Sequence, residues 1–209
     1  MSDKKIALIG DIVGSRQIKK RADFDERLSA ALQSLNRQRS GLLSPYTVTI
    51  GDEIQALFSN ADQLFCDTVT IQAAIYPQRM RFSIGVGELV TPVNPRHAIG
   101  MDGPAFHLAR DGISTLKKNN ELYIIQGETP NLVLINSSLG LVSHFMHKWS
   151  RTRLQVLEDL MHAETVKKIA AAHGISEQAV YKNIHAGALD KVIELFQQIE
   201  NALDFAIGG

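Results

Sequence analysis

Two short acidic motifs, each at the end of a strand-like run, constrain the fold of this chain more than any other feature. Asp11 follows the apolar run 6–9, which is short and rich in branched side chains and is therefore typical of a buried strand. Asp52 follows a glycine between two further strand-like runs, 46–50 and 54–58, so we predict a tight hairpin with this aspartate at its tip. Two carboxylates brought together repel each other unless a cation lies between them, and oxygen ligands favour a hard ion such as Mg²⁺. The sequence therefore predicts a divided Mg²⁺ site, and Mg²⁺ in turn suggests a phosphate-bearing ligand.

Segments with helical periodicity lie between these strand-like runs. Apolar residues recur at helical spacing over residues 24–35 and again over about 61–76, and a further strand-like run covers 80–87. The resulting order of strand, helix, hairpin, helix and strand is the β-α-β-β-α-β unit of ferredoxin-like folds. We therefore predict an α+β domain over residues 1–147, followed by a small all-α domain over 148–209.

A third helix is predicted to begin at residues 102–104, Asp-Gly-Pro, because Asp and Gly cap helices and Pro suits their first turn. The free amides of such an N-terminus attract anions. Two interpretations stay open: the helix only packs against the core, or it contacts an anion or nucleotide, with Arg110 taking part. Ser15 and Arg16, just past the first acidic motif, are similarly placed to meet a phosphate.

The C-terminal third has the residue spacing of a helix-turn-helix. A small residue, Ala170, lies where two helices would touch, and Gly174 lies at the turn. An apolar residue, Ile175, follows the turn, and the branched Val180 lies deeper in the second helix. The outward side of that second helix is expected to face base edges or phosphates of double-stranded DNA. Its DNA-binding candidates are Ser176, Gln178, Ala179, Tyr181, Lys182 and His185.

The charge of this C-terminal region argues against strong DNA binding by one copy. Acidic residues slightly outnumber basic ones after residue 147, and basic contacts to phosphate supply most of the nonspecific affinity of proteins for DNA. Two roles therefore stay open for the helix-turn-helix, which are DNA binding and protein contact or dimerisation.

Composition narrows the class of protein. With 209 residues, 44% of them hydrophobic, and no net charge, the chain has room for one medium domain and a small appendage. A single cysteine, Cys66, excludes a disulfide framework. No apolar stretch approaches the roughly 20 residues needed to span a bilayer. We therefore expect a cytoplasmic protein without membrane insertion.

Three segments carry a family resemblance. Residues 10–16, 51–58 and 100–110, followed by the helix-turn-helix, resemble the hallmarks of the small bacterial SatD family. The acid after the first strand, the Gly-Asp hairpin and an Arg-x-x-Ile-Gly-x-Gly strand beginning at Arg81 resemble the catalytic domain of class III nucleotidyl cyclases. The hairpin is also distantly similar to that of diguanylate cyclases.

The cyclase resemblance implies roles for particular residues. It implies that Asp11 and Asp52 bind the metal and that Ile12 offers its backbone carbonyl. The later cyclase motif falls on residues 103–111, where His107 stands at the position of the cyclase asparagine and an aspartate at that of the arginine that stabilises phosphate charge. Retained metal ligands beside this altered second half suggest nucleotide binding more strongly than cyclisation. Cyclase sites form between two subunits, so the resemblance also implies a homodimer.

These observations together predict a nucleotide- and Mg²⁺-responsive regulator that binds DNA. Two alternatives stay open: a divergent cyclase or other nucleotidyl or phosphoryl transferase using two Asp-bound metals, and an assembly module with vestigial sites. Whether the protein is an enzyme is therefore left undecided, and no catalytic residue is assigned. The candidate ligands of a nucleoside triphosphate or other nucleotide are Gly14, Ser15, Arg16, Gly51, Glu53, His107 and Arg110.

Overall fold

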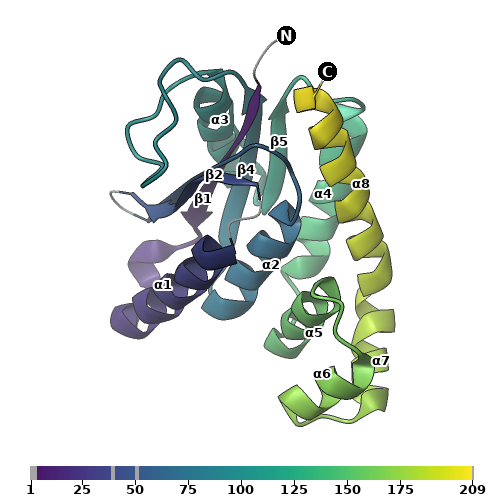
Figure 1. Cartoon of the computed structure of the whole chain (residues 1–209). Coiled ribbons are helices and arrows are strands. Elements are labelled where there is room, and N and C mark those ends of the chain that lie inside the picture. Colours follow the sequence, from purple (N-terminus) through teal and green to yellow (C-terminus); the bar gives the residue numbers. More distant parts are fainter. Residues whose placement is uncertain (1–3, 39–40, 50–51, 209) are drawn as a thin grey trace.

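The computed structural model describes residues 4–38, 41–49 and 52–208 (Figure 1). Five strands and eight helices in these residues confirm the mixed α+β class. In chain order the elements are β1 (Lys5–Ile12), a short 3₁₀ turn η1 (Ser15–Gln17), α1 (Arg21–Gln38), β2 (Leu42–Val48), β3 (Glu53–Phe58), α2 (Leu64–Ile75), β4 (Met80–Gly87), α3 (Pro104–Asn119), β5 (Tyr123–Gly127), α4 (Leu132–Met146), α5 (Arg151–Met161), α6 (Val166–His173), α7 (Glu177–Gly187) and α8 (Leu189–Gly208).

One sheet with the strand order β2-β3-β1-β4-β5 forms the centre of the molecule. The neighbours are antiparallel except for β4 and β5, which are parallel. Strand β1 is buried on both faces because its side chains alternate between two apolar layers. Ile6 and Leu8 belong to the layer that includes α1 and α2, whereas Ala7 and Ile9 pack in the layer under α3. The register places Asp11 opposite Glu53 on one side and opposite Arg81 on the other.

The edge strand β2 differs from its expected bounds. It begins at Leu42 rather than at residue 46 and ends at Val48, while the hairpin tip that includes Gly51 lies outside the described residues. The register between β2 and β3 shifts twice between Leu42 and Thr47. Pro45 lies inside this irregular part, and an edge strand tolerates proline because one side of the strand has no ladder to supply with hydrogen bonds.

Helix α8 returns from α7 along the molecule and packs against α2 and the sheet (Figure 1). Phe196 stacks on Phe65 with ring centroids 4.3 Å apart and an angle of 7° between the ring planes. The Glu200 carboxylate accepts a hydrogen bond from the Phe65 backbone N–H at 2.9 Å, and Asp204 accepts one from Ala61 at 2.6 Å. One apolar core therefore runs from the sheet into the C-terminal helices. The expected domain boundary after residue 147 stays a prediction.

None of the helices in the described residues is long and apolar enough to span a membrane.

Candidate functional site

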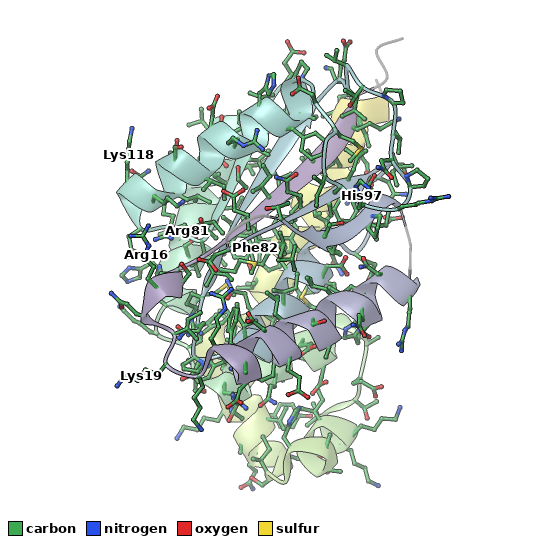
Figure 2. The ribbon with its side chains drawn as sticks, turned by 90° about the vertical axis from the view of Figure 1, so that its left-hand side faces the viewer. Arg16, Lys19, Arg81, Phe82, His97 and Lys118 are labelled. Atoms are coloured by element: carbon green, nitrogen blue, oxygen red, sulfur yellow. The ribbon has the colours of Figure 1, made fainter. Side chains whose placement is uncertain are left out.

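Asp11 lies at the end of β1 and is held by two basic side chains. Only 7% of the residue is exposed. Its carboxylate contacts the Lys117 Nζ at 2.8 Å and the Arg81 Nη1 at 3.3 Å, one through each oxygen. Arg81 lies directly opposite Asp11 in the register between β1 and β4. Lys117 lies in the last turn of α3, the helix that packs on these two strands. Figure 2 shows Arg81 and Arg16 on the same side of the molecule as Lys118, the neighbour of Lys117.

Asp52 is held by a cation from the opposite layer. Its carboxylate accepts a hydrogen bond from the Arg21 Nη1 at 2.7 Å, and the Nε of the same arginine binds Asp25 at 2.8 Å. A hydrogen bond from the Ser15 side chain, then the bond and charge of Arg21, lower the pKa of Asp52 below its ordinary value. The carboxylate is therefore ionised at neutral pH, as a metal or cation ligand must be.

The backbones of the two acidic motifs are joined directly. The Ile12 N–H donates to the Asp52 carbonyl at 3.1 Å, and the Val13 N–H donates to the Arg79 carbonyl at 2.8 Å. Gly14 then adopts a left-handed conformation with φ of 64°, which glycine accepts without strain and which turns the chain into η1. The sheet thus brings Asp11 and Asp52 together at the backbone. Their carboxylates, however, are paired with cations from different layers, α3 and β4 for Asp11 and α1 for Asp52.

The donor set fits Mg²⁺ that arrives with phosphate. Asp11 and Asp52 offer carboxylate oxygens, and the Ile12 carbonyl belongs to the same corner. Within the described residues no group of three or more His, Cys, Asp or Glu side chains is placed to hold a metal. Mg²⁺ typically uses one or two carboxylates and completes its shell with waters and substrate phosphates, so a larger acidic cage is unnecessary.

A hollow of about 300 Å³ lies beside Asp52, between α1 and the β2–β3 hairpin. This volume is at the lower end of the range of small-molecule sites. The hollow is not among the sites predicted from the sequence, although Arg21, Asp25 and Ser29 recur every four residues on α1 and thus share one face. The lining combines apolar walls with polar groups: Ile12, Leu28, Val48 and Ile54, and Arg21, Asp25, Ser29, Asp52 and Glu53.

The structure places His107 and Arg110 away from the two aspartates. His107 lies in the first turn of α3 and Arg110 in the second, whereas Lys117, which does contact Asp11, is ten and seven residues further on, or about 15 Å and about 10 Å along the helix. The His107 Nε2 contacts the Asp102 carboxylate at 2.6 Å, and this hydrogen bond lowers the pKa of Asp102. A role for His107 and Arg110 in nucleotide binding stays a prediction, as it does for Gly51, outside the described residues.

The C-terminal candidates lie on one exposed side of α7. Gly174, with φ of 61°, follows the last residue of α6 as its C-cap, and the Ser176 hydroxyl caps α7 by accepting from the Ala179 N–H at 3.1 Å. Ala170 and Val180 are buried where α6 and α7 meet. Ala179 is half-buried, whereas the remaining candidates are exposed: Ser176, Gln178, Tyr181, Lys182 and His185.

Comparisons with known proteins show a family and distant structural likenesses. No curated protein matches the chain. A solved structure of a bacterial light-regulated adenylyl cyclase is 14% identical, with a TM-score of 0.40, over 60% of this chain and 76% of that one. The SatD family model matches residues 5–198. Since this match spans most of the chain, the protein belongs to the SatD family.

Proposed function

We propose that this protein is a regulator that binds a Mg²⁺–nucleotide at the end of β1 and contacts DNA through α6 and α7. One observation carries the nucleotide part: both predicted metal ligands, Asp11 and Asp52, are ionic partners of basic side chains that phosphate can also bind. A bound nucleotide phosphate would pair with Arg21 and Lys117, and Mg²⁺ would bind the carboxylates. When bound, Mg²⁺ supplies charge neutralisation and orientation of the phosphate oxygens.

Two further features near the carboxylates, Arg16 and the hollow beside Asp52, support nucleotide binding. Arg16 lies close enough to Asp52 to affect its pKa electrostatically and adds a further basic group for phosphate. The hollow beside Asp52 shares Arg21 and Asp52 with the ion pairs, and its apolar walls suit the nucleoside part of the ligand. The strand order β2-β3-β1-β4 supports a ferredoxin-like arrangement for this part of the chain.

The DNA-binding part of the proposal is supported by the pair α6 and α7. Two short helices are joined at a left-handed glycine, and the second one is capped by Ser176; both features support the helix-turn-helix interpretation. Tyr181 is 50% exposed on α7 and offers both an aromatic face and a hydroxyl to a nucleic acid. A homodimer would present two such helices about 34 Å apart, one turn of DNA.

An enzyme is the second candidate, and one arrangement favours it. Arg81 and Lys117 converge on Asp11, so a phosphate bound there would have two cations to stabilise charge that develops during transfer. The same two aspartates would then serve a cyclase or a nucleotidyl or phosphoryl transferase. The third alternative, an assembly module, predicts no nucleotide binding at all.

Calorimetry with a panel of nucleoside triphosphates, with and without Mg²⁺, tests the proposal. We expect Mg²⁺-dependent binding by the wild type that the double variant Asp11→Asn, Asp52→Asn loses. Glu194→Gln, on the exposed side of α8, is a control that removes one carboxylate charge far from the site, where the double variant removes two, and it should bind like the wild type. Absence of binding by the wild type would refute the proposal. Product in the recovered samples would favour the enzyme.

A further inference from the structure

The predicted Mg²⁺ ligands already have cations as partners. Both oxygens of the Asp11 carboxylate are engaged, Oδ1 by Lys117 and Oδ2 by Arg81, and Asp52 is engaged by Arg21. We propose that Lys117 and Arg21 act as a cation lock, an inference that rests on the proposed function. The lock keeps free Mg²⁺ out of the site and opens when a polyphosphate binds these two side chains.

Exposure separates the cations that can leave from the one that stays. The Arg81 side chain is only 12% exposed. Lys117 is 50% exposed and Arg21 is 45% exposed, so both can swing towards solvent without opening the core. Asp25 holds Arg21 near the site through its Nε, even when the Nη1 is withdrawn from Asp52. Arg81 is therefore the fixed partner of Asp11, and Lys117 and Arg21 are the exchangeable ones.

The exchange follows from charge balance. A free Mg²⁺ ion must displace an ammonium or guanidinium group that gains no new partner, so the released cation opposes binding. A di- or triphosphate offers that partner, because its oxygens accept charge-assisted hydrogen bonds from Lys117 and Arg21. The freed carboxylates then bind the metal that accompanies the phosphate. Metal and polyphosphate thus favour each other's binding, and by linkage the two effects are equal in size.

Lys118 gives a matched control for Lys117. It is the next residue of α3 and is exposed, and one helical step turns its side chain by about 100° away from that of Lys117. Replacing either lysine by methionine removes one positive charge from the same helix end. Only Lys117→Met removes a partner of Asp11.

Two titrations of the full chain test the lock, one for the affinity of the metal and one for the affinity of the polyphosphate, and they should respond in opposite directions. Mn²⁺ alone is titrated and its free-ion signal followed by electron paramagnetic resonance. Inorganic triphosphate is titrated by calorimetry in the presence of a chelator, so that no metal takes part. We expect Lys117→Met to bind Mn²⁺ about tenfold more tightly and triphosphate about tenfold more weakly than the wild type. Lys118→Met should change neither affinity by more than about twofold.

Lys117→Arg keeps a cation near Asp11, so it should bind Mn²⁺ as weakly as the wild type. A gain in affinity that appears in Lys117→Met and not in Lys117→Arg is then due to the lost charge and not to a disturbed fold. Unchanged Mn²⁺ affinity in Lys117→Met, or an equal gain in Lys118→Met, would overturn the lock. If the wild type binds Mg²⁺–nucleotide in that case, the proposed function stands without it. If no nucleotide or triphosphate binds to the wild type but Lys117→Met gains Mn²⁺ affinity, the exclusion of metal is supported and the proposed function fails.

Discussion

At the scale of single residues, the partners of Asp11 differ in how much each stabilises the fold. The side chains of Asp11 and Arg81 are 11% and 12% exposed, whereas Lys117 is half exposed. Removing one member of a buried pair leaves an uncompensated charge and costs about 3–5 kcal/mol, while an exposed ion pair contributes about 1 kcal/mol or less. We therefore expect Arg81→Met to lower the free energy of unfolding by about 3 kcal/mol, and Lys117→Met by less than about 1 kcal/mol. Urea denaturation of the three proteins measures both values.

A double variant separates the packing lost with Arg81 from the effect of the Asp11 charge, which in Arg81→Met keeps only the half-exposed Lys117 as a partner. Asp11→Asn removes the charge that Arg81→Met leaves behind, so the combined variant should be more stable than Arg81→Met alone. Equal losses in Arg81→Met and Lys117→Met would contradict the assignment of Arg81 as the fixed partner.

Two half-buried glutamates make stability depend on pH. Burial raises the pKa of Glu158 and of Glu200 to about 7. The folded state therefore holds protons that the unfolded chain releases near pH 4.5, so the stabilisation is complete below about pH 4.5 and is lost as the pH rises through about 7. Each group should lower the free energy of unfolding by up to about 1.4 kcal/mol per pH unit within that window.

Glu200→Gln tests this pH dependence because its side-chain oxygen can still accept the hydrogen bond of the Phe65 N–H. Denaturation midpoints measured from pH 5 to pH 8 should fall less steeply in this variant than in the wild type. Glu194→Gln, on the exposed side of the same helix, should keep the wild-type slope. Parallel profiles for all three proteins would contradict the burial argument.

At the scale of elements, α3 is positioned by its close approach to β4. A Cβ atom added at Gly85 would meet the backbone carbonyl of Ala105 and lie 2.7 Å from the Ala109 nitrogen. Backbone atoms cannot yield as a flexible side chain does, so the helix itself would have to move. We expect Gly85→Ala to lower the free energy of unfolding by at least 1–3 kcal/mol, the usual cost of overpacking. Thermal denaturation measures this loss, and Gly208→Ala, where nothing lies within 4 Å, is the control.

The elements also show how far the sequence determines the site. Periodicity and turn residues predict β1, α1, α2 and β4, because each depends on its own local pattern. The same local patterns predict that Asp11 and Asp52 lie at one corner, because the β2–β3 hairpin only has to pair with the neighbouring strand β1. The lock residue Lys117 was missed because residues 88–103, a long connection without helix or strand, leave open which end of α3 reaches that corner. Its identification required the register and the helix direction, which depend on contacts distant in sequence.

At the scale of the whole molecule, α8 connects the two proposed binding regions. It begins next to α7 and ends beside α2, where Glu200 and Asp204 accept backbone hydrogen bonds from the segment that starts that helix (Figure 1). Phe196 of α8 also contacts the ring of Tyr123 on β5. A nucleotide that shifts α1 or β4 would therefore act on the same core that supports α7. We propose that this continuity is the route by which a bound ligand would affect the proposed DNA-binding helices.

The DNA-binding part of the proposal makes a prediction about salt. Each lysine that contacts a phosphate releases counterions, so removing one such contact lowers the slope of log affinity against log salt by about 1. Lys182 is exposed on α7 beside Tyr181, whereas Lys191 lies on α8 and is paired with Glu194 at 2.7 Å. With a mixed-sequence duplex and fluorescence anisotropy at several salt concentrations, we expect Lys182→Gln to reduce the slope and Lys191→Gln to leave it unchanged. Identical slopes for both variants would contradict a phosphate contact by Lys182 and so the DNA-binding role of α7, because a side chain that meets no phosphate has no counterions to release.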